Sequence, residues 1–439
     1  MKVNVIPRWT LRLFSLFSLL GSLMFPGSAM AANVAVDCSG QTPGAFGSLQ
    51  AALDSLDVTG PHLISVTGTC TENVSIFNRQ RISIFAASGQ TATINAANPA
   101  AIVVHIFESQ GITLQGLVIQ GGQTGVLVNQ TSDVHIQNST IQNNSGAGVG
   151  VQIGSALTMD TSNTIQNNGG AGMFDGGGST VTLSTLPGQQ IKILGNGGDG
   201  IDMDGSFLQV NFGSLDVENN VGAAIVQQGG RLLVFGDGVG NVFQGNGEGI
   251  DILHSASAGF AGKNTIRNNG EVGLQILGSS VVFNGGLNAT VIEGHSILGV
   301  NVVRMGELTM NGPHKIQNNG GPGADPTLRG GIRAVRSSLT LIGGTNVSNN
   351  TGPGLRADQN AGTVLSNVTV SGNTEQGVLV GRQSVAGFTQ PLSIVGNGAA
   401  SVACDTTSLL FGDLSGIDNL DCKRIERTQG PPRAGTVHE

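Results

Sequence analysis

From Val134 to Val149 the chain reads VHIQNSTIQNNSGAGV, and this stretch decides the fold. Apolar and polar residues alternate in two short runs, and small residues then open a third run at Gly148. Alternation of this kind places every second side chain on the same face of a β-strand. The stretch therefore predicts three short strands that are separated by tight turns.

The same pattern recurs along most of the chain. A strand of the form Gly/Ala-apolar-x-apolar begins at intervals of 23 to 32 residues. Its first residues are Gly125, Gly148, Gly172, Gly200, Ala224, Gly249, Gly273, Gly299, Gly331, Gly354 and Gly377. A dipeptide that contains Asn, such as Asn143-Asn144, precedes most of these strands. Asn and Gly tolerate the positive φ of a sharp bend, so the dipeptides predict a column of turns whose amides hydrogen-bond along the axis.

One repeat cannot bury its apolar face alone, but stacked repeats build a continuous core and complete the backbone hydrogen bonds. We therefore predict an all-β, single-stranded right-handed parallel β-helix of three-strand coils, with about 13 coils and a length of ~60 Å. In the strand after Gly200, Ile201 and Met203 should point inward while Asp202 and Asp204 point outward. A leucine-rich repeat has a similar period, but its L-x-x-L-x-L frame is missing, and a left-handed hexapeptide helix would repeat faster.

Two stretches of the chain resemble the pectin-lyase-like superfamily. Residues 67–76, TGTCTENVSI, resemble the segment that opens the first coil of such proteins, and residues 134–149 resemble their generic coil. The resemblance covers residues 63–398 and implies the right-handed β-helix fold with a helix over its N-terminal opening. It implies no single activity, because the superfamily includes lyases, hydrolases, esterases, epimerases and non-catalytic adhesins.

Residues 1–31 have the order of a secretory signal peptide. A basic start precedes the apolar run 13–24, and Ala29-Met30-Ala31 forms a small-x-small cleavage motif. A membrane anchor is the rival interpretation, but about 12 apolar residues are too few to span a bilayer. A lipoprotein would need a Cys directly after the cleavage site, and Cys38 lies too far on. We therefore expect a secreted protein, extracellular or periplasmic, with no membrane span in the mature chain.

The rest of the chain divides into four expected parts. Residues 32–60 form an N-terminal cap with a helix over 48–56, and residues 61–400 form the β-helix. Residues 401–427 form a disulfide-closed C-terminal cap, and residues 428–439 form a disordered tail. Ser48 is the expected N-cap of the helix, whose apolar face carries Leu49, Ala52, Leu53 and Leu56.

Four cysteines form two local couples at opposite ends of the predicted rod, Cys38 with Cys70 and Cys404 with Cys422. Exported proteins favour disulfides, and each could contribute ~3 kcal/mol to stability in the loop-entropy model. A zinc site is the competing interpretation, but neither couple has CxxC spacing.

Charge and aromatic content limit the partners. Cleavage after Ala31 would take the formal net charge from −8 to −11, and no basic stripe exists, so nucleic acid is excluded as a partner. The single Trp lies in the signal peptide and the chain has no Tyr, which leaves Phe174 and Phe207 as the nearest substitutes for a sugar-stacking platform. We expect a monomer.

The outward positions of the Gly strands run from acidic to basic along the stack. Asp202 and Asp251 lie two coils apart, about 9.6 Å from the strand spacing, which is near the upper limit for the acids of an inverting glycosidase. The basic residues that could bind uronate carboxylates are Arg329, Arg333, Arg336 and Arg356. The acidic residues that could chelate Ca²⁺ are Asp199, Asp202 and Asp204. The longest interval contains a loop, residues 320–329, that should bring Asp325 and Arg329 near Arg333.

Two functions follow as alternatives. We favour a non-catalytic extracellular binding or structural rod, because polar residues are the rule on the outer face of any solenoid. The alternative is an extracellular lyase or inverting glycoside hydrolase that acts on an acidic polysaccharide through Asp202 and Asp251. The sequence lacks the paired Asp and Arg-Ile-Lys marks of polygalacturonases, and Gly294-His295-Ser296 matches only part of their Gly-His-Gly. Neither function requires a cofactor, and Ca²⁺ is the one ion that the acidic cluster suits.

Overall fold

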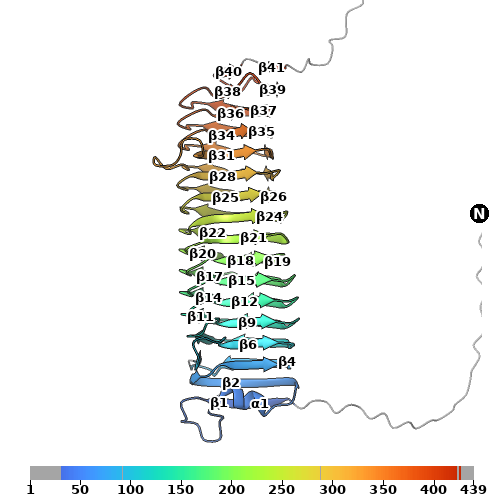
Figure 1. The fold of residues 1–439 in the computed structure, drawn as a ribbon, viewed down its shortest axis with the longest axis vertical. Coiled ribbons are helices and arrows are strands. Elements are labelled where there is room, and N and C mark those ends of the chain that lie inside the picture. Colours follow the sequence, from blue (N-terminus) through green and yellow to red (C-terminus); the bar gives the residue numbers. More distant parts are fainter. Residues whose placement is uncertain (1–30, 91, 287, 423–424, 427–439) are drawn as a thin grey trace, which may run out of the picture.

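The strands of successive repeats stack in parallel and form a straight rod, as Figure 1 shows. The computed structural model describes residues 31–90, 92–286, 288–422 and 425–426. The chain winds through about 14 turns and contains a single short helix in these residues, so the predicted right-handed parallel β-helix is confirmed and the coil number is close to that expected.

One sheet contains the strands that the Gly pattern predicts. It has 15 strands, and every neighbouring pair in it is parallel. Its strands are β3 (Val74–Phe77), β6 (Val104–Phe107), β9 (Val126–Asn129), β12 (Val149–Gln152), β15 (Met173–Gly176), β18 (Ile201–Asp204), β21 (Ala223–Gln228), β23 (Glu248–Leu253), β25 (Val272–Leu277), β28 (Leu298–Val303), β31 (Gly330–Val335), β34 (Leu355–Asp358), β36 (Val378–Val380), β38 (Val402–Cys404) and β40 (Leu420–Cys422). We call it the 15-stranded sheet.

The other two strands of each coil join into a 26-stranded sheet that covers the remaining faces of the rod. The strands of this sheet that matter below are β1 (Ala32–Asp37), β2 (Thr59–Thr71), β16 (Thr180–Ser184), β19 (Phe207–Gly213), β22 (Arg231–Gln244), β24 (Ser257–Arg267) and β26 (Ser280–Asn284). Because β1 pairs with β2, the stack of strands begins at Ala32.

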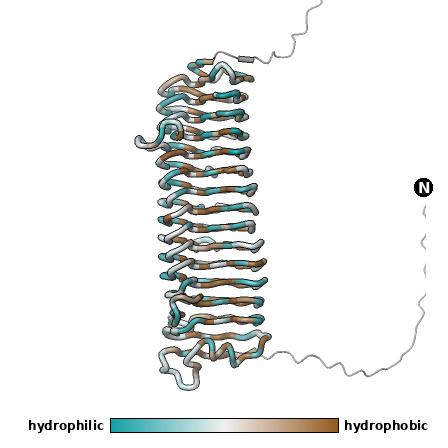
Figure 2. The backbone as a smooth tube through the Cα atoms, viewed as in Figure 1, coloured by the Kyte–Doolittle hydropathy of each residue, from teal (hydrophilic) through white to brown (hydrophobic). Residues whose placement is uncertain are grey.

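The core follows from the alternation of apolar and polar residues. In β18, Ile201 and Met203 are fully buried, whereas Asp202 is half-buried and Asp204 is exposed, as predicted. The same alternation repeats from coil to coil and gives the banded pattern of Figure 2. Each inward residue stacks on its counterpart in the next coil, so the rod has one continuous apolar core.

The predicted Asn column is a hydrogen-bonded ladder inside the turns. The side-chain amide of Asn144 donates to Oδ1 of Asn168 at 2.9 Å, and that of Asn168 donates to Oδ1 of Asn196 at 3.0 Å. The residue before each Asn takes the positive φ of the bend, 55° at Asn143 and 61° at Gly195. The ladder continues through Asn220, Asn246, Asn269, His295, Asn319, Asn350, Asn373 and Asn397.

His295 occupies one step of this ladder and not a catalytic position. Its Nδ1 accepts the backbone N–H of Asn269 at 3.3 Å, and its Nε2 lies 3.1 Å from the carbonyl oxygen of Ile266. These partners require a neutral ring with the proton on Nε2. Burial accordingly lowers the pKa of His295 to about 4.

A short helix, α1 (Leu49–Asp54), lies at the N-terminal end of the stack (Figure 1). Ser48 is its N-cap as predicted, and Leu49, Ala52 and Leu53 are buried, but the helix ends two residues before the expected boundary. Glu72 accepts hydrogen bonds from the backbone N–H groups at the start of α1, so the TGTCTE segment joins this helix to the first coil.

Both predicted disulfides are present, one near each end of the rod. Cys38 bonds to Cys70, and Cys404 on β38 bonds to Cys422 on β40. No helix within the described ranges is long and apolar enough to cross a membrane. The expected signal peptide, apart from Ala31, and the expected tail 428–439 lie outside the described residues.

Candidate functional site

The outward column of the 15-stranded sheet has the order that the sequence predicts. Pairing of the strands places Phe174 beside Asp202, Asp202 beside Val226, and Val226 beside Asp251. The column then continues through Gln275, Asn301, Arg333 and Arg356. Asp202 and Asp251 are thus two coils apart with Val226 between them.

A hollow of about 390 Å³ opens on this face over β23, β25, β28 and β31. We call it the Asp251 hollow. Its lining residues are Glu248, Asp251, Glu271, Val272, Gln275, Ile297, Leu298, Asn301, Leu328 and Arg333. Asp251 and Arg333 therefore line the same hollow, three coils apart on the outward column, and Asp202 is not among its lining residues.

Asp251 is the most perturbed acid of the hollow. Burial, followed by the neighbouring carboxylates of Glu248, Asp199 and Glu271, raises its pKa to about 8. One of its oxygens, Oδ1, is buried and has no hydrogen-bond partner among the described residues. Burial and nearby negative charge both disfavour the ionised form of a carboxyl group, so Asp251 is mainly protonated at neutral pH.

Three polar side chains form a hydrogen-bonded row beside this acid. The amide nitrogen of Asn301 donates to Oε1 of Gln275 at 2.8 Å, and Nη1 of Arg333 donates to Oδ1 of Asn301 at 3.1 Å. Burial and the nearby Arg356 lower the pKa of Arg333. Because a guanidinium carries five N–H donors and this is the only one bonded within the described chain, Arg333 retains donors for a ligand.

The long loop of residues 320–329 forms one wall of the Asp251 hollow through Leu328. In Figure 1 it projects from the stack near β31. Asp325 folds the loop back, since its carboxylate accepts the N–H and hydroxyl of Thr327, each at 2.8 Å. Asp325 therefore acts as a turn residue of the loop.

Two of the four predicted ligand-binding arginines hold this loop. Arg329 pairs with Glu375 at 3.0 Å, and Arg356 donates to the carbonyl oxygen of Thr327 at 2.7 Å. Arg336 lies in an exposed turn after β31, with a φ of 50°, and does not line the hollow. Arg333 is thus the one predicted arginine that lines the hollow.

The predicted calcium ligands do not converge. Asp199 uses its carboxylate to accept the backbone N–H of Ala223 at 2.7 Å, and Asp204 is exposed at the end of β18. A metal site needs several Asp, Glu, His or Cys ligand atoms close together. In the described chain, only Cys38, Cys70 and Glu72 place three such atoms within 4.8 Å of one another. The two cysteines form a disulfide with each other. Asp199, Asp202 and Asp204 are not grouped in this way in the described chain.

Sequence reasoning missed a carboxylate inside the rod. Asp175 on β15 pairs with Val151 and Met203 of the adjacent strands, which are inward positions, and only 4% of it is exposed. Neither carboxylate oxygen has a hydrogen bond of good geometry, and burial raises the pKa to about 7 although the hydroxyls of Ser206 and Ser179 act to lower it. The alternation of inward and outward residues along β15 is the sequence signal that could have shown Asp175 to point inward.

The comparisons with known proteins concern the fold. Residues 62–185 and 101–263 match the profile of a family described as "Right handed beta helix region". No protein of curated function matches the sequence significantly. The structure is similar to the A-module of a mannuronan C-5 epimerase from Azotobacter vinelandii, with 12% identity, 90% of this chain and 100% of that chain covered, and a TM-score of 0.41.

Two further solved structures are similar at the same level. A pectate lyase shows 14% identity over 72% of this chain and 77% of its own, with a TM-score of 0.36. An alginate lyase from Paenibacillus sp. shows 15% identity over 64% of this chain and 99% of its own, with a TM-score of 0.35. At these identities the likeness concerns the fold alone.

Proposed function

We propose that this right-handed β-helix protein is an extracellular, non-catalytic rod that binds an acidic polysaccharide at the Asp251 hollow. The observation that supports the proposal is the row of Gln275, Asn301 and Arg333 along that hollow, in which the guanidinium keeps unused donors. A guanidinium binds carboxylates through two parallel hydrogen bonds, which a uronate sugar can accept. The amides suit the hydroxyl groups of neighbouring sugars.

The charge of Asp251 is compatible with an anionic ligand. A carboxylate in this position would repel a uronate, but its raised pKa keeps it protonated at neutral pH. Protonated Asp251 offers a donor and no charge, so the hollow presents Arg333 as a cation beside a neutral acid. The remaining acids, Glu248 and Glu271, lie on the N-terminal side of the hollow, away from Arg333 along the stack.

The two disulfides support export to an oxidising compartment, where such bonds persist. The stacked coils support the role of a rod, because solenoids offer long rigid surfaces for extended ligands. An extracellular polysaccharide is an extended ligand of this kind.

Binding is the first test. The mature protein would be titrated by calorimetry with oligogalacturonate, oligomannuronate, hyaluronan and chondroitin sulfate fragments, and with cellohexaose as a neutral probe. We expect at least one acidic probe to bind and Arg333→Gln to weaken it at least about tenfold, since a hydrogen bond to a charged group is worth ~1.5–3 kcal/mol. Arg304→Gln, which removes a charge from an exposed turn after β28, should leave the affinity unchanged. Equal affinity of both variants would refute the proposal.

A polysaccharide lyase or glycoside hydrolase is the second candidate, and the raised pKa of Asp251 in the lining of the hollow favours it. A carboxylic acid whose pKa is near the working pH suits general acid–base catalysis. The same probes would be followed at 235 nm for unsaturated products and by reducing ends. The rod predicts no product from the wild-type protein. Turnover that is lost in Asp251→Asn would replace the binding role with an enzymatic one.

A further inference from the structure

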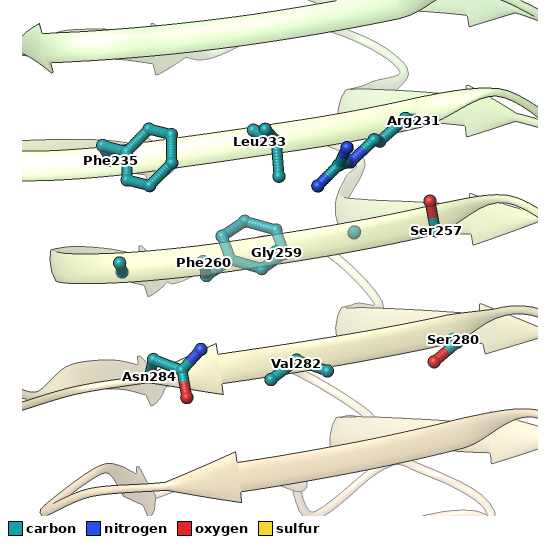
Figure 3. Close-up of a pocket in the computed structure, with 11 residues that line it drawn as sticks. Arg231, Leu233, Phe235, Ser257, Gly259, Phe260, Ser280, Val282 and Asn284 are labelled. Atoms are coloured by element: carbon teal, nitrogen blue, oxygen red, sulfur yellow. The ribbon is translucent and has the colours of Figure 1, made fainter. Parts of the chain in front are cut away.

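A second recess lies on the 26-stranded sheet, away from the Asp251 hollow. It is a trough of about 490 Å³ that follows β24 between the outward side chains of β22 and β26 (Figure 3). Its floor is the outward row of β24, which consists of the small residues Ser257, Gly259 and Ala261. The rows on either side are larger, so the trough results from one coil of small side chains between two coils of larger ones.

The two walls of the trough differ in chemistry. The β22 wall carries Leu233 and Phe235, and Phe235 is 37% exposed. The β26 wall carries the polar side chains of Ser280 and Asn284 on either side of Val282. A ligand in this trough would meet an apolar surface along one edge and hydrogen-bonding groups along the other.

Arg231 supplies the charge of the trough. Its guanidinium extends from β22 toward β24 in Figure 3, it is exposed, and it has no salt bridge within the part of the chain that the structure describes. Among the residues whose side chains the structure describes, it is the only formally charged one in the lining of the trough. An anionic group is therefore the complementary partner, in a protein whose net charge of −8 otherwise repels anions.

The trough continues into a neighbouring hollow through the same arginine. This hollow of about 360 Å³ lies over the starts of β16, β19 and β22 and is lined by Phe207, Ser206 and three stacked glycines. Arg231 lines both spaces and sits directly beside Phe207 in the strand register. A ligand longer than one sugar ring could occupy both spaces with its anionic group at Arg231.

The position of the trough argues against an extended peptide as the ligand. β24 is hydrogen-bonded to β22 on one side and to β26 on the other, so its backbone offers no free edge for an added strand. The ligand must bind through side chains alone. A pyranose fits this requirement, because its C–H face packs on Phe235 and Leu233 while its hydroxyl groups reach Ser280 and Asn284.

We propose that this trough is a second carbohydrate-binding site, specific for an oligosaccharide with a carboxylate or sulfate group that pairs with Arg231. The site is independent of the Asp251 hollow, which lies on the other sheet. Phe235 and Leu233 provide the packing surface, and Arg231 sets the preference for an anionic sugar.

The test fills the trough without disturbing the fold. A Cβ added at Gly259 meets only the tip of Leu233, at 3.1 Å, so Gly259→Val should fold, and valine also favours strands. Thr309→Val is the matched control, because Thr309 pairs with Val282 in the same outward column, one coil beyond the trough. Arg231→Gln removes the charge, and Lys315→Gln is its control, an exposed cation on a different strand. Thermal unfolding would verify that all four variants are folded.

Calorimetry with tetrasaccharides of galacturonate, mannuronate and chondroitin sulfate, and with cellotetraose, gives the readout. We expect the wild-type protein to bind an anionic tetrasaccharide. Gly259→Val and Arg231→Gln should each weaken the affinity for this tetrasaccharide at least about tenfold. Both control variants should bind it with the wild-type affinity. Absence of binding by every anionic probe would overturn the proposal, as would affinities that neither Gly259→Val nor Arg231→Gln changes. Binding that is lost only in Arg333→Gln would also overturn it while leaving the role of the Asp251 hollow intact.

Discussion

Nη2 of Arg329 lies 3.0 Å from Oε1 of Glu375, and this contact holds the loop 320–329 against the C-terminal coils. The two residues are 46 positions apart in the chain. Arg356 adds a second anchor through the carbonyl oxygen of Thr327. The loop is thereby fixed with Leu328 at the wall of the Asp251 hollow.

Glu375→Gln should loosen the loop while leaving the fold intact. The pair is partly exposed, with 21% and 34% of the two side chains accessible, so its loss should change the free energy of unfolding by less than about 1 kcal/mol. Amide hydrogen exchange in residues 321–329 should become faster. Arg382→Gln, which breaks the pair between exposed Arg382 and Asp358 at 3.5 Å, is the control and should leave that exchange unchanged. Equal protection of the loop in wild type and Glu375→Gln would contradict this role.

His295→Asn should stabilise the rod in acid. The native pKa of about 4 lies below the unperturbed value of 6.5, so the neutral ring contributes stability above pH 6.5 that is lost as the pH falls through about 4. Asn keeps the ladder contact without titrating, so the variant should lose less stability between pH 6.5 and 4. Urea unfolding at several pH values measures this difference. His254→Asn, in an exposed turn with a φ of 55°, is the control, and a parallel acid loss in wild type and His295→Asn would refute the account.

Asp175→Asn should stabilise the rod in base. The native pKa of about 7 lies above the unperturbed value of 3.8, so the contribution of this group is fully present below pH 3.8 and is lost as the pH rises through 7. Asn is neutral throughout, and we expect the variant to exceed the wild type by about 1–3 kcal/mol at pH 8–9, after allowance for solvent screening. The two proteins should be nearly equal at pH 4. A difference in unfolding free energy that does not depend on pH would speak against a buried, titrating Asp175.

Binding at the Asp251 hollow should weaken in base. Above the pKa of about 8, ionised Asp251 adds a negative charge beside the site for an anionic sugar. The dissociation constant of an acidic oligosaccharide should therefore rise between pH 7 and 9 in the wild type and stay nearly constant in Asp251→Asn. Calorimetry at fixed ionic strength measures it. The same pH dependence in both proteins would show that another group is responsible.

The sequence predicts the regular part of this molecule well because one periodic rule governs it. Alternation within each Gly strand was sufficient to place the outward residues of successive coils on one column, and pairing of the strands confirms their order. These residues are Asp202, Val226, Asp251, Gln275 and Asn301. The Asn dipeptides marked the turns correctly because each turn needs a residue with a positive φ, which Asn and Gly tolerate.

Contacts between irregular segments escaped the sequence analysis. Arg329 was assigned to ligand binding because it precedes a groove strand, but its partner Glu375 lies coils away and no spacing rule relates the two. Asp251 lines one hollow with Glu248 and Arg333, whereas the sequence paired Asp251 with Asp202, since pattern alone cannot show where the surface is hollow. His295 continues the ladder because its Nδ1 accepts the same hydrogen bond as an Asn oxygen.

The central claim is that the Asp251 hollow binds an acidic sugar through Arg333. A crystal structure of the mature protein, soaked with the acidic oligosaccharide that binds most tightly in the calorimetric panel, tests it most directly. We predict sugar density over β23 to β31, with a carboxylate or sulfate within about 3 Å of the Arg333 guanidinium, the length of a charge-assisted hydrogen bond. Sugar density elsewhere on the rod, with the hollow holding only solvent, would contradict the claim.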